Sequence, residues 1–318
     1  MKLSIGVVAA AVLAAGAAQA AGYHAPRNAW GQPDLGGTWN SDYAMPLEAT
    51  PGVPLVLDEA AAKAFARKLA DEIHSYAAFR IDGEVQDLAE RNARTGLGVV
   101  MGQRRSRQVV LPADGIIPMP PRVRGQVRYI ENLIRNSADP PIPSDGPEQR
   151  RNWERCLVGQ GQPPITVTND INPREIVQGK DQVVILTEYG PDLRVIPFTD
   201  RHGPKTFDGP LGDSIARWEG ETLVIETVRL PAADTVRPLP TLLVPPSAVV
   251  EERYTRVSPT ELLYQYTVRD PAIYTGPWLA EYSLTRTAQP ILEFACHEGN
   301  YSLPNILAGA RAQDRARR

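Results

Sequence analysis

The chain has 318 residues, with 34 basic and 37 acidic side chains and a formal net charge of −3 at pH 7. This balance provides no basic face of the kind that nucleic-acid binding requires, so we expect no nucleic-acid partner. The length allows one large β domain or two average domains, each with a substantial core.

The first 20 residues have the three parts of a cleavable secretory signal peptide. Lys2 supplies positive charge, residues 3–18 are uncharged, and Ala18-Gln19-Ala20 meets the small-x-small rule for cleavage. A membrane anchor is the alternative, but the uncharged run is short and rich in Ala and Gly. We therefore expect a periplasmic or secreted protein, cleaved after Ala20, with no membrane span in its mature form.

Residues 57–136 carry two helical patterns. Asp58 is a typical N-cap residue, and apolar residues then recur at helical spacing to about residue 80. A second amphipathic stretch predicts a helix over 124–136. We interpret 57–136 as a helical insertion in a single domain, 21–311, which a frayed basic tail follows at 312–318.

From about residue 163, short β-rich runs alternate with turn signals, as in Glu219-Gly220. The predicted strands are 174–178, 182–189, 193–198, 214–219, 221–227, 249–257, 261–268, 278–286 and 291–297. Their density is typical of a β-barrel or sandwich. There is no dinucleotide fingerprint and no P-loop, so an α/β nucleotide enzyme is not expected, and we predict no cofactor.

A further short strand is expected at Trp39. Gly37-Thr38-Trp39 resembles the G-x-W motif of lipocalins, whose barrels hold one small ligand. A core tryptophan at a strand start is the simpler interpretation of the same three residues. We predict a mainly β fold: an antiparallel lipocalin-like barrel, closed by the Trp39 strand, with the helical segment packed against its outside or mouth.

Longer motifs resemble those of a family of exported bacterial proteins known mostly as hypothetical open reading frames. The motifs are Pro33-Asp-Leu-Gly-Gly-Thr-Trp39, Glu154-Arg-Cys-Leu157, Gln178 with Val183-Val-Ile-Leu186, Leu211-Gly-Asp-Ser-Ile-Ala-Arg-Trp-Glu-Gly-Glu-Thr-Leu-Val-Ile-Glu-Thr227, Glu252-Arg-Tyr-Thr-Arg256 and Ala295-Cys-His-Glu-Gly-Asn-Tyr301. The resemblance covers most of residues 30–311. It implies export and a shared fold, and it supplies no reaction.

The two cysteines, Cys156 and Cys296, are expected to form a disulfide, because export carries them into an oxidising compartment. The alternative is a nucleophilic Cys296 beside His297. Neighbouring residues in a strand point to opposite faces, which disfavours that pairing.

Acid–base chemistry is the catalytic hypothesis. The chain has four histidines, and none forms a pair with metal-ligand spacing, so we predict no metal site. His297 is the preferred proton-transfer residue, with Glu298, Asp213 and Glu226 as candidate carboxylates. The alternatives are a structural role for His297 at a strand end and a buried Arg–Glu pair for Glu226.

Several further residues are candidates for binding a substrate. Arg217 or Tyr189 would stabilise developing negative charge. An aromatic stripe with Tyr264 and Tyr266 is more typical of a core than of a pocket, but a cavity there would take a hydrophobic or aromatic ligand. The full set is Arg217, Trp218, Tyr189, Tyr264, Tyr266, Trp278 and Glu281.

These features favour a cofactor-independent lyase or isomerase that acts on a small hydrophobic or aromatic molecule. The first alternative is a periplasmic carrier or sensor that binds such a molecule unchanged. The second is an envelope structural or interaction protein, which a filled interior would favour. The sequence does not indicate the oligomeric state.

Overall fold

The computed structural model describes residues 22–41, 43–75, 96–135, 144–167, 172–190, 192–204, 209–238 and 241–317. The expected leader at 1–20 and its cleavage site lie outside these residues. Within them, no helix has both the length and the apolar character needed to cross a membrane.

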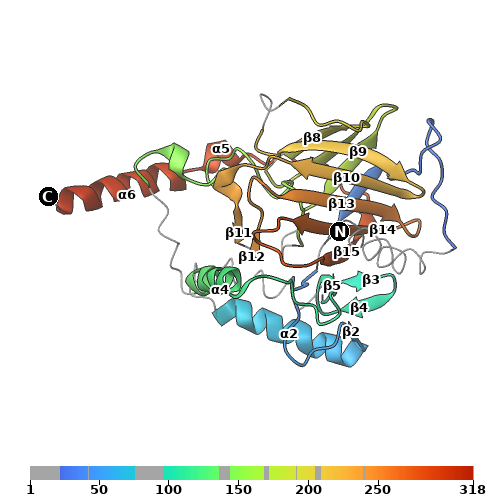
Figure 1. The fold of residues 1–318 in the computed structure, drawn as a ribbon, viewed down its shortest axis with the longest axis horizontal. Helices are drawn as coiled ribbons and strands as arrows, with labels where there is room; N and C mark the ends of the chain where they lie inside the picture. Colours follow the sequence, from blue (N-terminus) through green and yellow to red (C-terminus); the bar gives the residue numbers. More distant parts are fainter. Residues whose placement is uncertain are drawn as a thin grey trace, which may run out of the picture.

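One large antiparallel sheet organises the chain (Figure 1). Its hydrogen-bonded path runs β8-β7-β6-β1-β15-β14-β13-β10-β9, and β5 also pairs with β15. The strands are β1 (Gly37–Asn40), β5 (Val109–Leu111), β6 (Arg174–Gln178), β7 (Gln182–Thr187), β8 (Asp192–Pro197), β9 (Asp213–Glu219), β10 (Thr222–Val228), β13 (Val249–Arg256), β14 (Glu261–Arg269) and β15 (Leu279–Thr287). The mainly β, antiparallel prediction is therefore confirmed.

The strand with Trp39 occupies a central place in this sheet. β1 pairs with β6 on one side and with β15 on the other, so it joins the two halves of the sheet. The indole of Trp39 is fully buried, and its Nε1–H donates to the carbonyl of Leu35 at 2.9 Å. The expected core position of Trp39 is confirmed.

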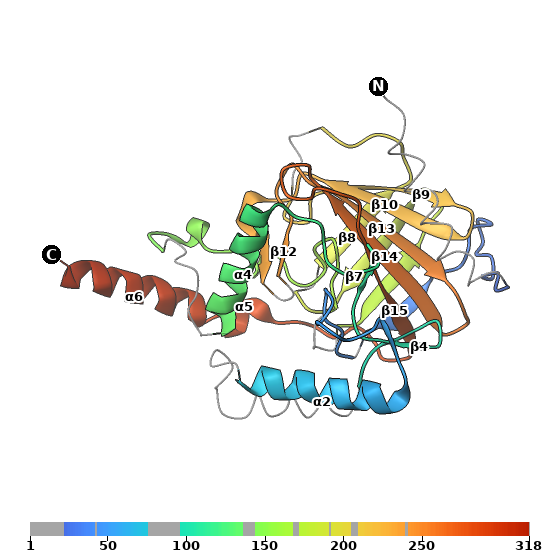
Figure 2. The same ribbon diagram turned by 60° about the horizontal axis from the view of Figure 1, so that its bottom comes forward.

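The sheet curls until its two halves face each other (Figure 2). Arg194 on β8 reaches Glu252 on β13, and Arg174 on β6 reaches Tyr282 on β15. The main core, with these polar groups among it, lies between the two halves. Side chains from most strands of the sheet therefore meet in one interior.

The described strands do not show the closed barrel that we predict. The hydrogen-bonded path ends at β8 and β9, and in the part of the chain that the structure describes these strands share one isolated bridge, Phe198–Ala216. Pro197 ends β8 and has no N–H to donate, which limits pairing there. We call this junction of β8 and β9 the seam.

The predicted strand at 291–297 is wrong. Residues 288–295 are irregular, and a short helix, α5 (Cys296–Gly299), follows. Pro290 removes a backbone donor at the start of the predicted strand, which opposes pairing. The helix α6 (Ser302–Ala316) then projects from the body (Figures 1 and 2) and includes residues 312–316, for which we expected a frayed tail.

Two longer helices, α2 (Glu59–Ser75) and α4 (Pro121–Arg135), precede β6 in the chain. Helix α2 begins after Asp58, whose carboxylate accepts the N–H of Ala61 at 2.8 Å, as an N-cap does. Residues 76–80 of the predicted helix lie outside the described residues. Helix α4 starts at a proline, which suits the first helical turn.

Short elements complete the fold. A three-stranded sheet is formed by β2 (Val56–Leu57), β4 (Gln103–Arg105) and β3 (Val99–Val100), and a two-stranded sheet by β11 (Val236–Pro238) and β12 (Thr241–Leu243). Two 3-10 turns lie at Pro147–Gln149 and Ala232–Asp234. Val123 and Val127 of α4 pack on Leu243 of β12, which places this helix against the main body.

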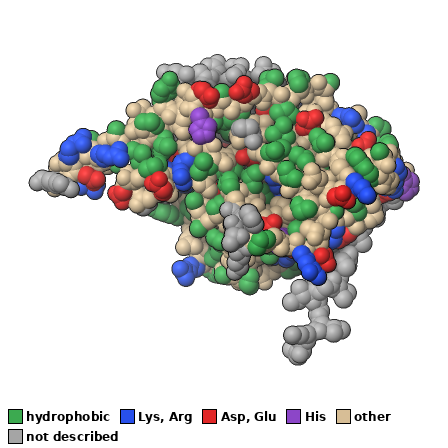
Figure 3. All heavy atoms as spheres, turned by 90° about the horizontal axis from the view of Figure 1, so that it is seen from above, with side chains coloured by type: hydrophobic (Ala, Val, Ile, Leu, Met, Phe, Trp, Pro, Cys, Tyr) green, Lys and Arg blue, Asp and Glu red, His purple; other side chains and the backbone are tan. Residues whose placement is uncertain are grey.

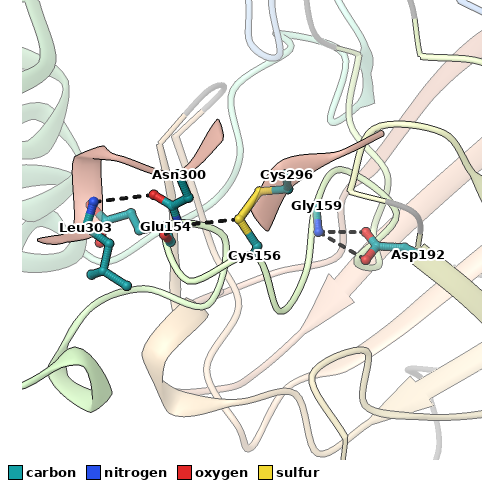
Figure 4. Close-up of a disulfide and its surroundings, with 7 residues drawn as sticks. All are labelled: Glu154, Cys156, Gly159, Asp192, Cys296, Asn300 and Leu303. Carbon is teal, nitrogen blue, oxygen red and sulfur yellow. Dashed lines mark hydrogen bonds between the residues drawn. A yellow bond between two sulfur atoms is a disulfide. The ribbon is translucent and has the colours of Figure 1, made fainter. Parts of the chain in front are cut away.

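The predicted Cys156–Cys296 disulfide is confirmed (Figure 4). Both cysteines are consumed by it, which overturns the alternative of a nucleophilic Cys296. Near the bridge, the side-chain amide of Asn300 donates to the carbonyl of Glu154 at 2.8 Å. The bridge therefore attaches α5 and the base of α6 to the 152–157 turn.

Removing this bridge is expected to destabilise the protein. Its loop spans 140 residues, for which chain entropy predicts a stabilisation of about 4 kcal/mol, with less usually measured. The Cys156→Ser/Cys296→Ser double variant should unfold at lower urea concentration and be cut by trypsin within α6 while still folded. Equal urea midpoints and equal cleavage of the variant and the oxidised wild type would contradict this.

Candidate functional site

Three predicted ligand-binding aromatics lie in the packed interior. Tyr264, Tyr266 and Trp278 are buried, and the ring of Tyr264 lies 4.9 Å from that of Tyr282. The hydroxyl of Tyr264 donates to Glu252 at 2.8 Å. The stripe contributes to the core, which was the simpler of the two interpretations.

The preferred catalytic histidine lies elsewhere. His297 and Glu298 are exposed on α5, next to the disulfide. Within the described residues, no contact joins the imidazole of His297 to Asp213 or Glu226. The structure therefore does not bring together the expected set of His297 and strand carboxylates.

A different histidine meets the two strand carboxylates. His202 Nδ1 lies 2.9 Å from Asp213 Oδ2, and His202 Nε2 lies 3.3 Å from Glu226 Oε1. Gly203 N–H donates to the same Asp213 oxygen at 2.9 Å. Imidazole and both carboxylates are partly exposed, with 21 to 30% of each side chain accessible.

The strand register explains this grouping. In the β9–β10 hairpin, Glu226 pairs with Ile215 and Val228 with Asp213, so Asp213 and Glu226 lie on the same face. That face is the outer one, because the buried residues Leu223, Ile225 and Thr227 alternate with it. The loop after β8 then places His202 over the pair.

Arginines partly neutralise the two carboxylates. Arg229 donates to Asp213 Oδ2 at 2.7 Å, and Arg269 donates to Glu226 Oε2 at 3.2 Å. Arg269 also binds Glu251. The site is therefore part of a charged network on the outer face of β9, β10, β13 and β14.

The same network affects Glu219, at the end of β9. Partial burial raises the pKa of this carboxyl, but hydrogen bonds from Arg253 and Arg217 outweigh burial and hold its pKa below the ordinary value. The Arg217 guanidinium therefore forms an ion pair with the Glu219 carboxylate, at 2.7 Å, and is also partly exposed to solvent.

A cleft of about 580 Å³ lies at the seam, beside Glu226. It combines an apolar surface with charged groups at its rim, and its lining includes the predicted residues Arg217, Trp218 and Glu226. The other lining residues are Gln32, Lys180, Phe198, Thr199, Asp200, Ile215 and Ala216. The rings of Phe198 and Trp218 are 6.3 Å apart.

A second cleft, of about 550 Å³, lies on the other side of the cluster. Arg229 lines it together with Asn152, Leu157 and several prolines and small apolar residues. The chain of contacts Glu226–His202–Asp213–Arg229 therefore runs from one cleft to the other.

The remaining predicted ligand-binding residues, Tyr189 and Glu281, do not line the seam cleft. The ring of Tyr189 packs against Phe294, with centroids 4.4 Å apart. Glu281 is buried on β15, pairs with Arg105 at 3.5 Å and accepts from Gln265 at 2.9 Å. Glu281 therefore has structural partners that the sequence did not predict.

Charged side chains of both signs lie on the face seen in Figure 3. Figure 3 shows acidic and basic side chains interspersed with hydrophobic ones over one broad face, with basic side chains gathered on the projecting helix. Across the described residues, no group of three or more His, Cys, Asp or Glu side chains is arranged to hold a metal ion. Comparison with models of known protein families and with curated proteins gives no match for this chain.

Asp192 is a buried carboxylate at the start of β8 (Figure 4). It accepts the N–H of Gly159 at 2.8 Å and that of Gly161 at 2.8 Å, which fixes the 158–162 segment against the sheet. Burial raises its pKa from 3.8 to about 6, although these N–H groups and Arg194 oppose the shift. Its ionised form therefore lowers stability.

This shift predicts a pH dependence of stability. Because the pKa is higher in the folded state, the stabilisation from protonated Asp192 is complete below pH 3.8 and is lost as pH rises through about 6. The shift corresponds to about 3 kcal/mol. Between pH 5 and 7.5, the free energy of unfolding of the wild type, measured with urea, should fall relative to that of Asp192→Asn.

The exposed Asp181 provides a matched control. Asp181→Asn should follow the wild-type pH profile. Parallel profiles for wild type and Asp192→Asn would contradict the assignment to Asp192.

Proposed function

We propose that the protein is an exported, cofactor-independent lyase or isomerase that takes a proton from a small hydrophobic or aromatic molecule in the seam cleft. The observation that carries this proposal is the position of His202, between Asp213 and Glu226 and next to the cleft. A histidine oriented by one carboxylate and facing a second one is suited to proton transfer near neutral pH.

The residues have different roles in this mechanism. Glu226 lines the cleft and accepts the substrate proton, and His202 takes the proton from it through Nε2. Asp213 holds the imidazole through Nδ1 and stabilises the imidazolium that results. Behind Glu226, His202 therefore relays the proton and Asp213 positions the imidazole.

The cleft supports the proposed class of substrate. Phe198, Ile215 and Trp218 offer apolar surface for a hydrophobic or aromatic ring. Lys180 and Arg217 line the same cleft, and positive charge there favours the negative charge that develops when a proton leaves carbon.

A carrier that binds without reaction is the second candidate. It is favoured by the ion pairs of Arg229 with Asp213 and of Arg269 with Glu226. These pairs can hold the loop after β8 in place without any role in a reaction. Tyr264, Tyr266 and Trp278 are packed in the interior, which favours a surface site over an interior one for a hydrophobic or aromatic molecule.

Deuterium exchange separates the two candidates. The full chain is incubated in D2O with phenylpyruvate or phenylacetone, aromatic carbon acids with and without charge, and deuterium at carbon is followed by mass spectrometry. The enzyme should exchange faster than buffer, and Glu226→Gln should lose at least roughly 100-fold of that rate. His202→Gln should also lose activity.

Glu251→Gln is the matched control, because Glu251 binds the same Arg269 but does not line the cleft. It should retain the wild-type rate. Binding of either compound, seen as Trp fluorescence quenching, without exchange above buffer would favour the carrier. Absence of both binding and exchange would contradict both candidates.

A further inference from the structure

Arg174 is fully buried in the interior, on β6. Its Nη1 donates to the hydroxyl of Tyr282 at 2.9 Å, and within the described residues no carboxylate forms a salt bridge with it. The neighbouring Arg194, by contrast, is paired with Glu252 at 2.6 Å. Of these two buried guanidinium groups, that of Arg194 has a carboxylate partner and that of Arg174 has none among the described residues.

Three buried polar atoms on the neighbouring strands β6, β7 and β8 lack a hydrogen-bond partner among the described residues. They are Nε of Arg174, Nε of Arg194 and Oγ1 of Thr187. Arg174 and Thr187 are register partners on β6 and β7, and Thr187 in turn pairs with Asp192, two residues before Arg194. All three side chains belong to the buried face of adjacent strands.

The described tyrosines and Asp192 at this end of the interior do not form an ion pair with Arg174. Burial raises the pKa of Tyr254, Tyr264 and Tyr282, so their hydroxyls stay neutral. Asp192 turns its carboxylate to the N–H groups of Gly159 and Gly161.

An unpaired guanidinium in an apolar interior is costly, and so is each buried donor without an acceptor. A single monovalent acceptor between β6, β7 and β8 would relieve both costs, since it can accept from Nε–H groups and from the Thr187 hydroxyl. Guanidinium groups are well suited to carboxylates and other oxyanions.

We propose that Arg174 and Thr187 form an interior binding site for a small monovalent anion, either a free halide or a compact carboxylate such as formate. Arg194 Nε lines the same site. Ile165 lies beside the same tyrosines, since its N–H donates to the Tyr264 hydroxyl and its carbonyl accepts from the Tyr282 hydroxyl. The site is inside the sheet, so it does not depend on the chemistry proposed for the seam.

Thermal unfolding of the full chain tests the site with sodium bromide and sodium formate as probes, with sodium gluconate keeping the ionic strength constant. The melting temperature of the wild type should rise and saturate with bromide or formate. Arg174→Met should show no such rise, and Thr187→Val should need roughly five-fold more anion. Arg128→Met, on the exposed face of α4, is the matched control and should behave as the wild type.

The two probes distinguish a free halide from a carboxylate. If formate raises the melting temperature and bromide does not, the site is assigned to carboxylates. An equal rise in wild type and Arg174→Met, or no saturable rise with either probe, overturns the proposal.

Anomalous diffraction from wild-type crystals grown with bromide provides a test that needs no variant. A bromide peak within hydrogen-bond distance of Arg174 Nε is expected if the site takes halides. For a carboxylate site, formate density at the same atoms is expected. Peaks at surface arginines alone, which mean an adventitious ion only, overturn the proposal.

Discussion

The pairing of β1 with β6 and β15 holds this structure together. Four residues, Gly37–Asn40, join strands that otherwise belong to two separate halves. Gly37 has φ +122° and lies against the Arg286 guanidinium, so a side chain there would be both strained and crowded. Arg256 and Arg286 lie over the Trp39 ring at 5.8 and 5.6 Å, which adds cation–π attraction at this joint.

The pairing of β1 with β6 and β15 also determines where polar chemistry is possible. Because the two halves face each other, the inner faces of β6 and β8 meet those of β13 and β15, and arginines, Glu252 and tyrosines share one interior. The outer faces of β9 and β10 remain accessible, and there Asp213 and Glu226 meet His202. Interior charge and surface charge are thus separated by one layer of backbone.

Much of the sheet could be predicted from the sequence, because alternating apolar residues and turn signals are local. The strands β6–β10 and β13–β15 and the place of Trp39 in the core follow from these local signals, whereas β11 and β12 are too short to give one. The pairing of the cysteines followed from the compartment and from there being two of them.

The failures have physical causes that act over distance. His202 lies in the loop after β8, and its contacts depend on the register of β9 with β10, which local patterns do not reveal. Its signal was weak: a histidine in a polar turn directly after a strand. The apolar run at 291–295 looked like a strand, but the disulfide holds its end next to Cys156, where α5 forms. The described edges β8 and β9 share one isolated bridge, and no pattern of alternation predicts whether two sheet edges meet.

The disulfide has a topological consequence. Cys156 and Cys296 enclose every strand from β6 to β15 in one covalent ring, and β1 lies outside that ring. The first and last strands of the ring, β6 and β15, are the two that flank β1. Closing the ring limits how far β6 and β15 can separate. The gap that β1 fills when it pairs with both strands is therefore already restricted.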